Sequence, residues 1–268
     1  MAKHRSKWNE KTYNRYIAEG RGQGNLENYR PWIRIQDFAS RGVVSRIKSN
    51  KTNRIIHLMS KNELYYFYLL EWADQVLDIR EQFPLIDVEM TTAIAKKIGV
   101  KHPTDNQSGF PYVLTSDFLI TMSDRTIART IKQSSELSNK RTLEKLEIER
   151  RYWKAKGVDW GIVTEHEIPI QKAKNIEWIY FSDNPSTLWM EKVEKARLCF
   201  EIQEEFYGSE APITEITSRL ENKYGLEPGT ALSLFKYLVR MKKIASPMEE
   251  CLQLSTIRRK DKLIKCMI

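Results

Sequence analysis

Residues 112–133 read "YVLTSDFLITMSDRTIARTIKQ", and this stretch decides the fold that we expect. It contains two runs rich in β-branched and apolar residues, separated by Ser123 and Asp124, which are typical of a tight turn. The pattern predicts two neighbouring strands of one sheet. Asp117 interrupts the first run near its centre, so a chemical reason for a carboxylate at that position is needed.

Strand geometry predicts that Lys132 lies close to Asp117. Side chains alternate between the two faces of a strand, so Asp117 shares a face with Thr115 and Leu119, and a turn at 123–125 brings Lys132 to that face. A partly buried ion pair is a poor source of stability. The alternative is a nuclease site, because phosphodiester hydrolysis needs a divalent cation held by carboxylates, an activated water and a positive charge near the phosphate. The spacing alone leaves both explanations open.

The surrounding elements predict an α/β domain. A helix at 60–73 begins with the capping-box pair Ser60 and Glu63, and a second helix is expected at 140–157. The order is a hairpin at 43–59, a helix, three strands, a helix and a final strand, which gives a mixed sheet flanked by helices. The expected core stripe of the second helix is Leu143, Leu146, Tyr152 and Trp153.

The positive charge of the chain lies mainly at its two ends. The net charge is +9, and residues 1–40 hold eight Lys/Arg against four Asp/Glu, while residues 241–268 hold seven against three. Clustered basic residues favour nucleic-acid binding, although solvated basic tails explain them equally well. The glycine-rich stretch at 19–24 follows no strand and lacks the ending of a phosphate loop, so we expect residues 1–40 to form a mobile basic arm.

The pattern becomes helical after residue 183. Three helices followed by a short hairpin suggest a winged-helix-like domain at 184–268, with Thr230–Met241 as its recognition helix. The remaining residues, 41–183, form the expected catalytic domain. Few basic residues decorate the recognition helix, so the C-terminal domain is as suited to a protein partner as to DNA. They are Lys236, Arg240, Lys242 and Lys243.

Composition excludes several classes of protein. No apolar run approaches the roughly 18–20 residues of a membrane span, and the first residues lack the apolar core of a secretion signal. We therefore expect a cytoplasmic protein with no membrane partner. Cys199, Cys251 and Cys266 are odd in number and far apart, so neither a disulfide framework nor a cysteine metal site is expected.

Several stretches between residues 19 and 180 resemble one family, in the family's order, over well over half of the chain. They are "EGRGQG" (19–24), "VLDIREQFPL" (76–85), "KHP" (101–103), "SDFLI" (116–120), "RTLEKLEIERRYW" (141–153) and "NIEWIY" (175–180). These stretches resemble TnsA, the endonuclease subunit of heteromeric, Tn-seven-like transposases. The resemblance implies a restriction-endonuclease-like fold of the PD-(D/E)xK superfamily.

The resemblance also implies the site residues. Glu63, Asp117 and Lys132 match the catalytic positions, with Glu63 and Asp117 as metal ligands and Lys132 acting on the water and the phosphate. The backbone carbonyl of Ile131 is a further expected ligand. The implied metal is Mg²⁺, with Mn²⁺ as a substitute and two ions as the expected number.

The chain departs from the family pattern at two positions. Thr130 stands where the family carries Glu or Gln, and Ser116 stands where a proline would precede Asp117. Both changes leave the number of metal ions open, and Thr130 is a doubtful ligand. Glu149 is an auxiliary acid by the family match, or a solvated helix residue paired with a neighbouring cation. Glu63 is equally suited to capping its helix.

Two functions follow as expectations. In the first, the chain is a Mg²⁺-dependent DNA endonuclease that hydrolyses the 5′ strands at transposon ends, together with a TnsB-like transposase and a TnsC-like AAA+ ATPase. The resemblance implies that the C-terminal domain docks on the ATPase. In the second, the nuclease site has decayed at Thr130, and the chain is a DNA-binding or scaffolding subunit of the transposition complex.

Overall fold

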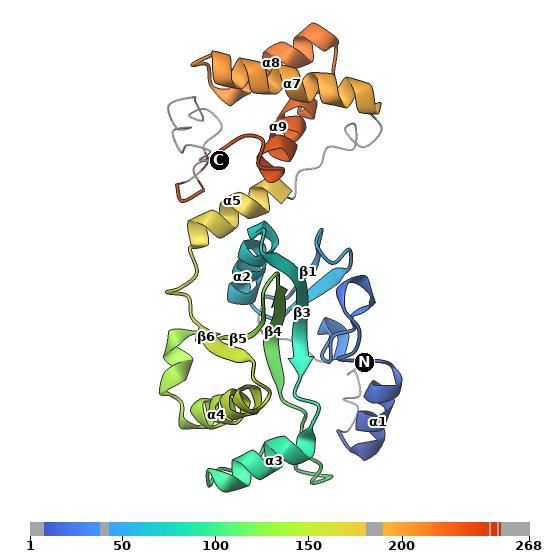
Figure 1. The fold of residues 1–268 in the computed structure, drawn as a ribbon, viewed down its shortest axis with the longest axis vertical. Helices are drawn as coiled ribbons and strands as arrows, with labels where there is room; N and C mark the ends of the chain where they lie inside the picture. The colour runs from blue at the N-terminus through green and yellow to red at the C-terminus, as the bar shows by residue number, and fades with distance from the viewer. Residues whose placement is uncertain (1–7, 38–42, 181–189, 247, 251, 253–268) are drawn as a thin grey trace. The chain divides into compact units, whose positions relative to one another are not determined.

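The computed structural model describes residues 8–37, 43–180, 190–246, 248–250 and 252, which are drawn as the coloured ribbon in Figure 1. The chain divides into two compact units, Met1–Ile168 and Pro169–Ile268. The sequence placed the boundary between residues 183 and 184, one helix later. That helix, α5 (Ile170–Tyr180), joins the second unit, where the ammonium of Lys236 lies 3.9 Å from the centre of the Trp178 ring.

The first unit contains the predicted mixed sheet. Its four strands follow one another in the order of the chain, and the first three are antiparallel, whereas the last pair is parallel. They are β3 (Val76–Pro84), β4 (Thr115–Met122), β5 (Thr126–Ile131) and β6 (Asp159–Val163). The predicted hairpin at 43–59 forms a separate two-stranded sheet of β1 (Ser45–Lys48) and β2 (Ile55–Leu58).

Three helices of the first unit accompany the sheet: α2 (Lys61–Trp72), α3 (Val88–Lys97) and α4 (Lys140–Ala155). Figure 1 shows α4 beside β5 and β6. It packs Tyr152 and Trp153 on one face of the sheet, against Leu119 and Ala128, which pair across β4 and β5. From α2, Tyr66 meets Phe118 on the other face, with ring centres 5.7 Å apart.

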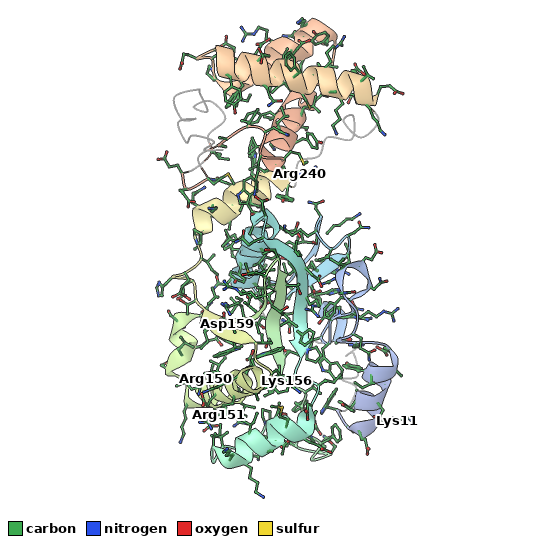
Figure 2. All side chains as sticks on the ribbon, in the orientation of Figure 1. Lys11, Arg150, Arg151, Lys156, Asp159 and Arg240 are labelled. Carbon is green, nitrogen blue, oxygen red and sulfur yellow. The ribbon has the colours of Figure 1, made fainter. Side chains whose placement is uncertain are left out.

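The prediction that Leu143 belongs to the core stripe of α4 is wrong. Leu143 is 46% exposed, whereas Leu146, Tyr152 and Trp153 are buried. The inward face of the first turns of α4 runs through Thr142 and Leu146, because these line a cavity beside the sheet, and Leu143 points away from it. On the outside of α4, Glu147 pairs with Arg150 and Arg151, both labelled in Figure 2.

Residues 8–37 are an integral part of the first unit, so the prediction of a mobile arm is wrong for them. Helix α1 (Glu10–Ala18) buries Tyr16 against Trp32 and Val113, and the Trp8 indole N–H donates to the carbonyl oxygen of Pro111 at 2.9 Å. The free energy gained by burying these aromatic side chains outweighs the solvation of the basic residues in the same segment. The remaining residues of the predicted arm lie outside the described ranges.

The second unit is helical, as predicted. Its main helices are α7 (Lys192–Gly208), α8 (Ile213–Tyr224) and α9 (Thr230–Arg240), and residues such as Ile202, Leu220 and Leu234 are buried between them. Cys199 is a buried free thiol. Within the described ranges, no helix is long and apolar enough to cross a membrane.

The predicted recognition helix and wing differ from the structure. Most of α9 is buried, including Lys236, so the helix is a core element of its unit. Residues 242–246 do not form the first strand of the expected hairpin, because the backbone N–H groups of Lys242, Lys243 and Ile244 close the end of α9. Apart from Leu252, the second strand of that hairpin lies outside the described residues.

Candidate active site

Asp117 lies where β4 and β5 separate. The antiparallel pairing of the two strands ends at Phe118 and Arg129, and beyond it the backbone N–H of Ile131 donates to the Asp117 carboxylate at 2.7 Å. The Lys132 ammonium lies 3.3 Å from the same carboxylate oxygen. Strand alternation therefore placed Asp117 and Lys132 together correctly.

Glu63 reaches the same place from the start of α2. Ser60 caps the helix by accepting from the Glu63 backbone N–H, and its hydroxyl donates to Glu63 Oε1 at 2.9 Å. The Met59 backbone N–H donates to Glu63 Oε2. The amide nitrogen of Gln82 lies 3.4 Å from both Glu63 Oε2 and Asp117 Oδ1, so the two carboxylates converge on one side chain. Glu63 thus takes part in the cap and also faces Asp117.

The charges of these groups depend on one another. Burial, and after it the neighbouring Asp117, raise the pKa of Glu63 to about 8, against hydrogen bonds from Met59 and Ser60 that lower it. Burial lowers the pKa of Lys132, but Asp117, Glu149 and Glu63 outweigh burial and raise the pKa overall. Lys132 is therefore a stable cation. We call Glu63, Gln82, Asp117 and Lys132 the Asp117 cluster.

Glu149 belongs to a second polar group, which we call the Glu149 cluster: Ser116, Thr130, Glu149 and Trp160. The hydroxyls of Ser116 and Thr130 and the indole N–H of Trp160 all donate to Glu149 Oε1. Burial raises the pKa of Glu149 to about 7, although these three donors lower it. The interpretation of Glu149 as a solvated helix residue is therefore wrong.

Thr130, the doubtful ligand of the sequence analysis, directs its hydroxyl to Glu149. The carbonyl oxygen of Ile131 accepts from the Lys132 ammonium at 2.9 Å, beside Asp117. The structure thus brings Glu63, Asp117, Lys132 and the Ile131 carbonyl together, and it gives Thr130 and Glu149 partners of their own.

Two cavities open on the Asp117 cluster, and Lys132 and Glu136 line both. The larger, of about 300 Å³, lies between the sheet and α4 and contains Asp117 and Lys145. The smaller, of about 170 Å³, lies at the start of α2 and contains Glu63. A ligand in either cavity would therefore contact carboxylates and amines together.

Sequence reasoning missed Gln82, Glu136 and Lys145. Gln82 lies within the quoted family stretch 76–85, where a polar residue in a strand was the available signal. Glu136 comes from the short 3₁₀ helix Ser134–Ser138, and Lys145 comes from the inward face of α4. No periodicity marks either of these two as a cavity residue.

The donor set of the Asp117 cluster suits a hard divalent cation. Among the described residues, no group of three or more His, Cys, Asp or Glu side chains is arranged to hold a metal ion. Mg²⁺ does not need such a cage, because it keeps several waters and binds through one or two carboxylates plus substrate phosphate oxygens. Glu63 and Asp117 supply two converging carboxylates, and the Ile131 carbonyl supplies a neutral oxygen.

Comparison with known proteins places the chain in a family. Residues 73–165 match the family model "TnsA-like endonuclease N terminal", and residues 167–248 match "TnsA endonuclease C terminal". The transposon Tn7 transposition protein TnsA of Escherichia coli is 40% identical over 241 residues, which cover 89% of this chain and 86% of that protein.

The chain belongs to the TnsA endonuclease family. The restriction-endonuclease-like fold expected for a TnsA protein is confirmed by the mixed sheet, its flanking helices and the helical C-terminal unit. The N-terminal TnsA match contains Asp117, Lys132 and Glu149, whereas Glu63 precedes it. The place of Glu63 in the site therefore rests on its geometry.

Proposed function

We propose that the chain is the Mg²⁺-dependent endonuclease subunit of a heteromeric transposase and hydrolyses the 5′ strands at transposon ends. One observation carries the proposal: Glu63, Asp117 and Lys132 converge beside two cavities in a TnsA family chain. Mn²⁺ is expected to substitute for Mg²⁺. Glu63, Asp117 and the Ile131 carbonyl would hold the metal, which supplies Lewis-acid activation of water and phosphate when bound.

The residues of the chain contribute orientation and charge to the reaction. The oxygen of a water molecule forms a bond to phosphorus as the bond from phosphorus to the departing 3′ oxygen breaks. The water gives up a proton to solvent, and the 3′ oxygen takes up a proton from solvent to leave as a hydroxyl. Lys132 remains cationic beside Asp117, so its ammonium offsets the negative charge that develops on the phosphate oxygens. The Ile131 N–H fixes the Asp117 carboxylate through its bond to Oδ2, which leaves Oδ1 directed at Gln82.

The complete reaction is proposed to need partners. A TnsB-like transposase would cut and join the 3′ strands, and a TnsC-like AAA+ ATPase would dock on the C-terminal unit. The Tn7 relative, a transposition protein by its name, supports a role in such a complex. A nuclease with nonspecific affinity for DNA is harmful when free, so activity only within the complex is expected.

The test is a reconstituted transposition reaction with partner proteins and Mg²⁺, in which a denaturing gel resolves both strands at each transposon end. Asp117→Asn is expected to reduce 5′-strand cutting by about 100- to 1,000-fold, with 3′ joining retained. Asp124→Asn is the matched control, because Asp124 is an exposed aspartate in the turn of the same hairpin. It should cut like the wild type.

Other outcomes contradict the proposal in different ways. If Asp117→Asn retains 5′ cutting, the assignment of the metal site is wrong. If the wild type makes no 5′ cuts with any metal, the chain acts as a DNA-binding or scaffolding subunit, and the change at Thr130 is the first place to look.

A further inference from the structure

Gln82 has an uncommon backbone conformation. Its φ is +48°, in the left-handed region that non-glycine residues seldom enter, and only 4% of the residue is exposed. A buried residue held in such a conformation requires surroundings that stabilise it, and conformations of this kind are concentrated at functional sites.

The left-handed turn changes the direction of the side chains of β3. In a regular strand, Glu81 and Phe83 would point to the same face. Here Glu81 accepts from Arg54 and from the His57 backbone N–H of β2, whereas Phe83 packs on Trp153 of α4, with ring centres 5.8 Å apart. The two neighbours of Gln82 thus lie on different sides, and the side chain of Gln82 is directed at Asp117 between them.

The amide of Gln82 is oriented by polar contacts at both of its ends. Its nitrogen donates to Glu63 Oε2 and Asp117 Oδ1, each at 3.4 Å, and its oxygen accepts from the Thr115 hydroxyl at 3.4 Å. An amide NH₂ has two protons, so it can serve both carboxylates at once. The shared donor therefore keeps the two carboxyl groups converged.

The N-terminal segment holds this part of β3 in place. The Trp32 backbone N–H donates to the Gln82 carbonyl, and the Tyr29 hydroxyl donates to the Glu81 carbonyl at 3.0 Å. Gly22 lies against Pro84 so closely that a Cβ atom at position 22 would stand 2.2 Å from the proline ring. The glycine-rich stretch that the sequence analysis assigned to a mobile arm is therefore packed on the strand that carries Gln82.

We propose that Gln82 is a positioning residue of the active site. Its amide holds Glu63 and Asp117 converged on one point, and the segment 22–32 maintains the left-handed turn that aims the amide. The inference rests on the proposed function, since it assigns Gln82 a role toward the metal of that site. It gives the N-terminal segment a part in catalysis through its packing on β3.

The test separates the amide from the turn. Gln82→Gly removes the amide but adopts the left-handed conformation without strain. The full-length chain is titrated with Mn²⁺ by calorimetry, and 5′-strand cutting is measured in the reconstituted reaction. We expect Gln82→Gly to weaken Mn²⁺ binding and slow cutting by about 10-fold or more, as for other residues that orient metal ligands. Its unfolding midpoint in EDTA is measured beside that of the wild type, and the titration is made at a temperature at which both chains are folded.

Two further variants complete the test. Asn53 has a φ of +54° in the turn between β1 and β2, so Asn53→Gly makes the same backbone change in the other sheet and should alter neither binding nor cutting. Tyr29→Phe removes the hydroxyl that donates to Glu81 but keeps the ring, which stacks on Phe83. It should weaken Mn²⁺ binding in the same direction as Gln82→Gly, by a smaller factor.

The outcomes are distinguishable. Wild-type Mn²⁺ affinity in Gln82→Gly overturns the inference, whether or not cutting falls, because the amide would then not position the metal ligands. If wild-type chain binds no Mn²⁺ and makes no 5′ cuts, the proposed function fails and the inference fails with it. Weakened binding in Gln82→Gly beside unchanged binding in Asn53→Gly supports the inference.

Discussion

The Asp117 cluster and the Glu149 cluster are neighbours, and both contain a buried carboxylate with a raised pKa. They differ in how those carboxylates are satisfied. Three donors from Ser116, Thr130 and Trp160 converge on one oxygen of Glu149. Glu63 accepts from Met59 and Ser60, and Asp117 accepts from Ile131 and Lys132. These two carboxylates also share a long contact with Gln82, and Asp117 lines the larger cavity together with Glu149. Burial alone therefore does not distinguish the proposed metal site; the convergence of two carboxylates from different elements beside Lys132 does.

The largest effect that sharpens this comparison is expected at Lys132. Lys132→Met keeps the length of the side chain but removes the charge beside Asp117, so 5′-strand cutting should fall by about 100-fold or more. Strand-resolved gels of the reconstituted reaction measure the fall. Lys145→Met is the control within the larger cavity, and an equal loss there would mean that general positive charge, and not the position of Lys132, is what matters.

The next effect concerns the Glu149 cluster. Glu149→Ala leaves the hydroxyls of Ser116 and Thr130 and the indole N–H of Trp160 without their acceptor, and it should lower the free energy of unfolding by about 2–4 kcal/mol. Urea unfolding measures the change. A loss below about 1 kcal/mol would show that the cluster does not attach α4 to the sheet in the way described.

Replacing Glu63 should raise the free energy of unfolding in the absence of metal, whereas replacing Glu149 should lower it. Its folded-state pKa of about 8 lies above the ordinary value of 4.5, so the folded chain binds more protons than the unfolded chain between these values, and stability falls as pH rises through this range. Glu63→Gln should remove this loss and raise the free energy of unfolding in EDTA at pH 8 by about 1–3 kcal/mol. A destabilised variant would indicate that Glu63 serves the helix cap above all.

The smallest effect is expected on the outside of α4. Hydrogen bonds from Arg150 and Arg151, opposed by slight burial, lower the pKa of Glu147 to about 2. The three side chains are partly exposed, so solvent screens the interaction, and Glu147→Gln should change the free energy of unfolding by less than about 0.5 kcal/mol. A change as large as that of Glu149→Ala would remove the distinction between inner and outer carboxylates of this helix.

The sequence predicted the local features well. Alternating side chains and the turn at Ser123 located the β4–β5 hairpin and the meeting of Asp117 with Lys132, because strand period and turn chemistry are local properties. The capping pair of Ser60 and Glu63 located the start of α2 for the same reason.

Long-range packing was the part that the sequence did not predict. Trp8 and Trp32 fold back on residues some 80 to 100 positions later in the chain, and the pattern of residues 1–40 does not encode those partners. The left-handed turn at Gln82 is also imposed by tertiary contacts, since glutamine has no preference for it. The mobile-arm prediction and the omission of Gln82 have this one cause.

The most direct test of the difference between the two clusters is the shift of the unfolding midpoint on adding Mg²⁺ to wild type, Asp117→Asn and Glu149→Gln. A ligand at 100 times its Kd stabilises a protein by about 2.7 kcal/mol, which is several degrees for a chain of this size. We predict that Asp117→Asn loses the shift and that Glu149→Gln retains it. A shift that survives in Asp117→Asn and disappears in Glu149→Gln would place the metal at the Glu149 cluster and contradict this account.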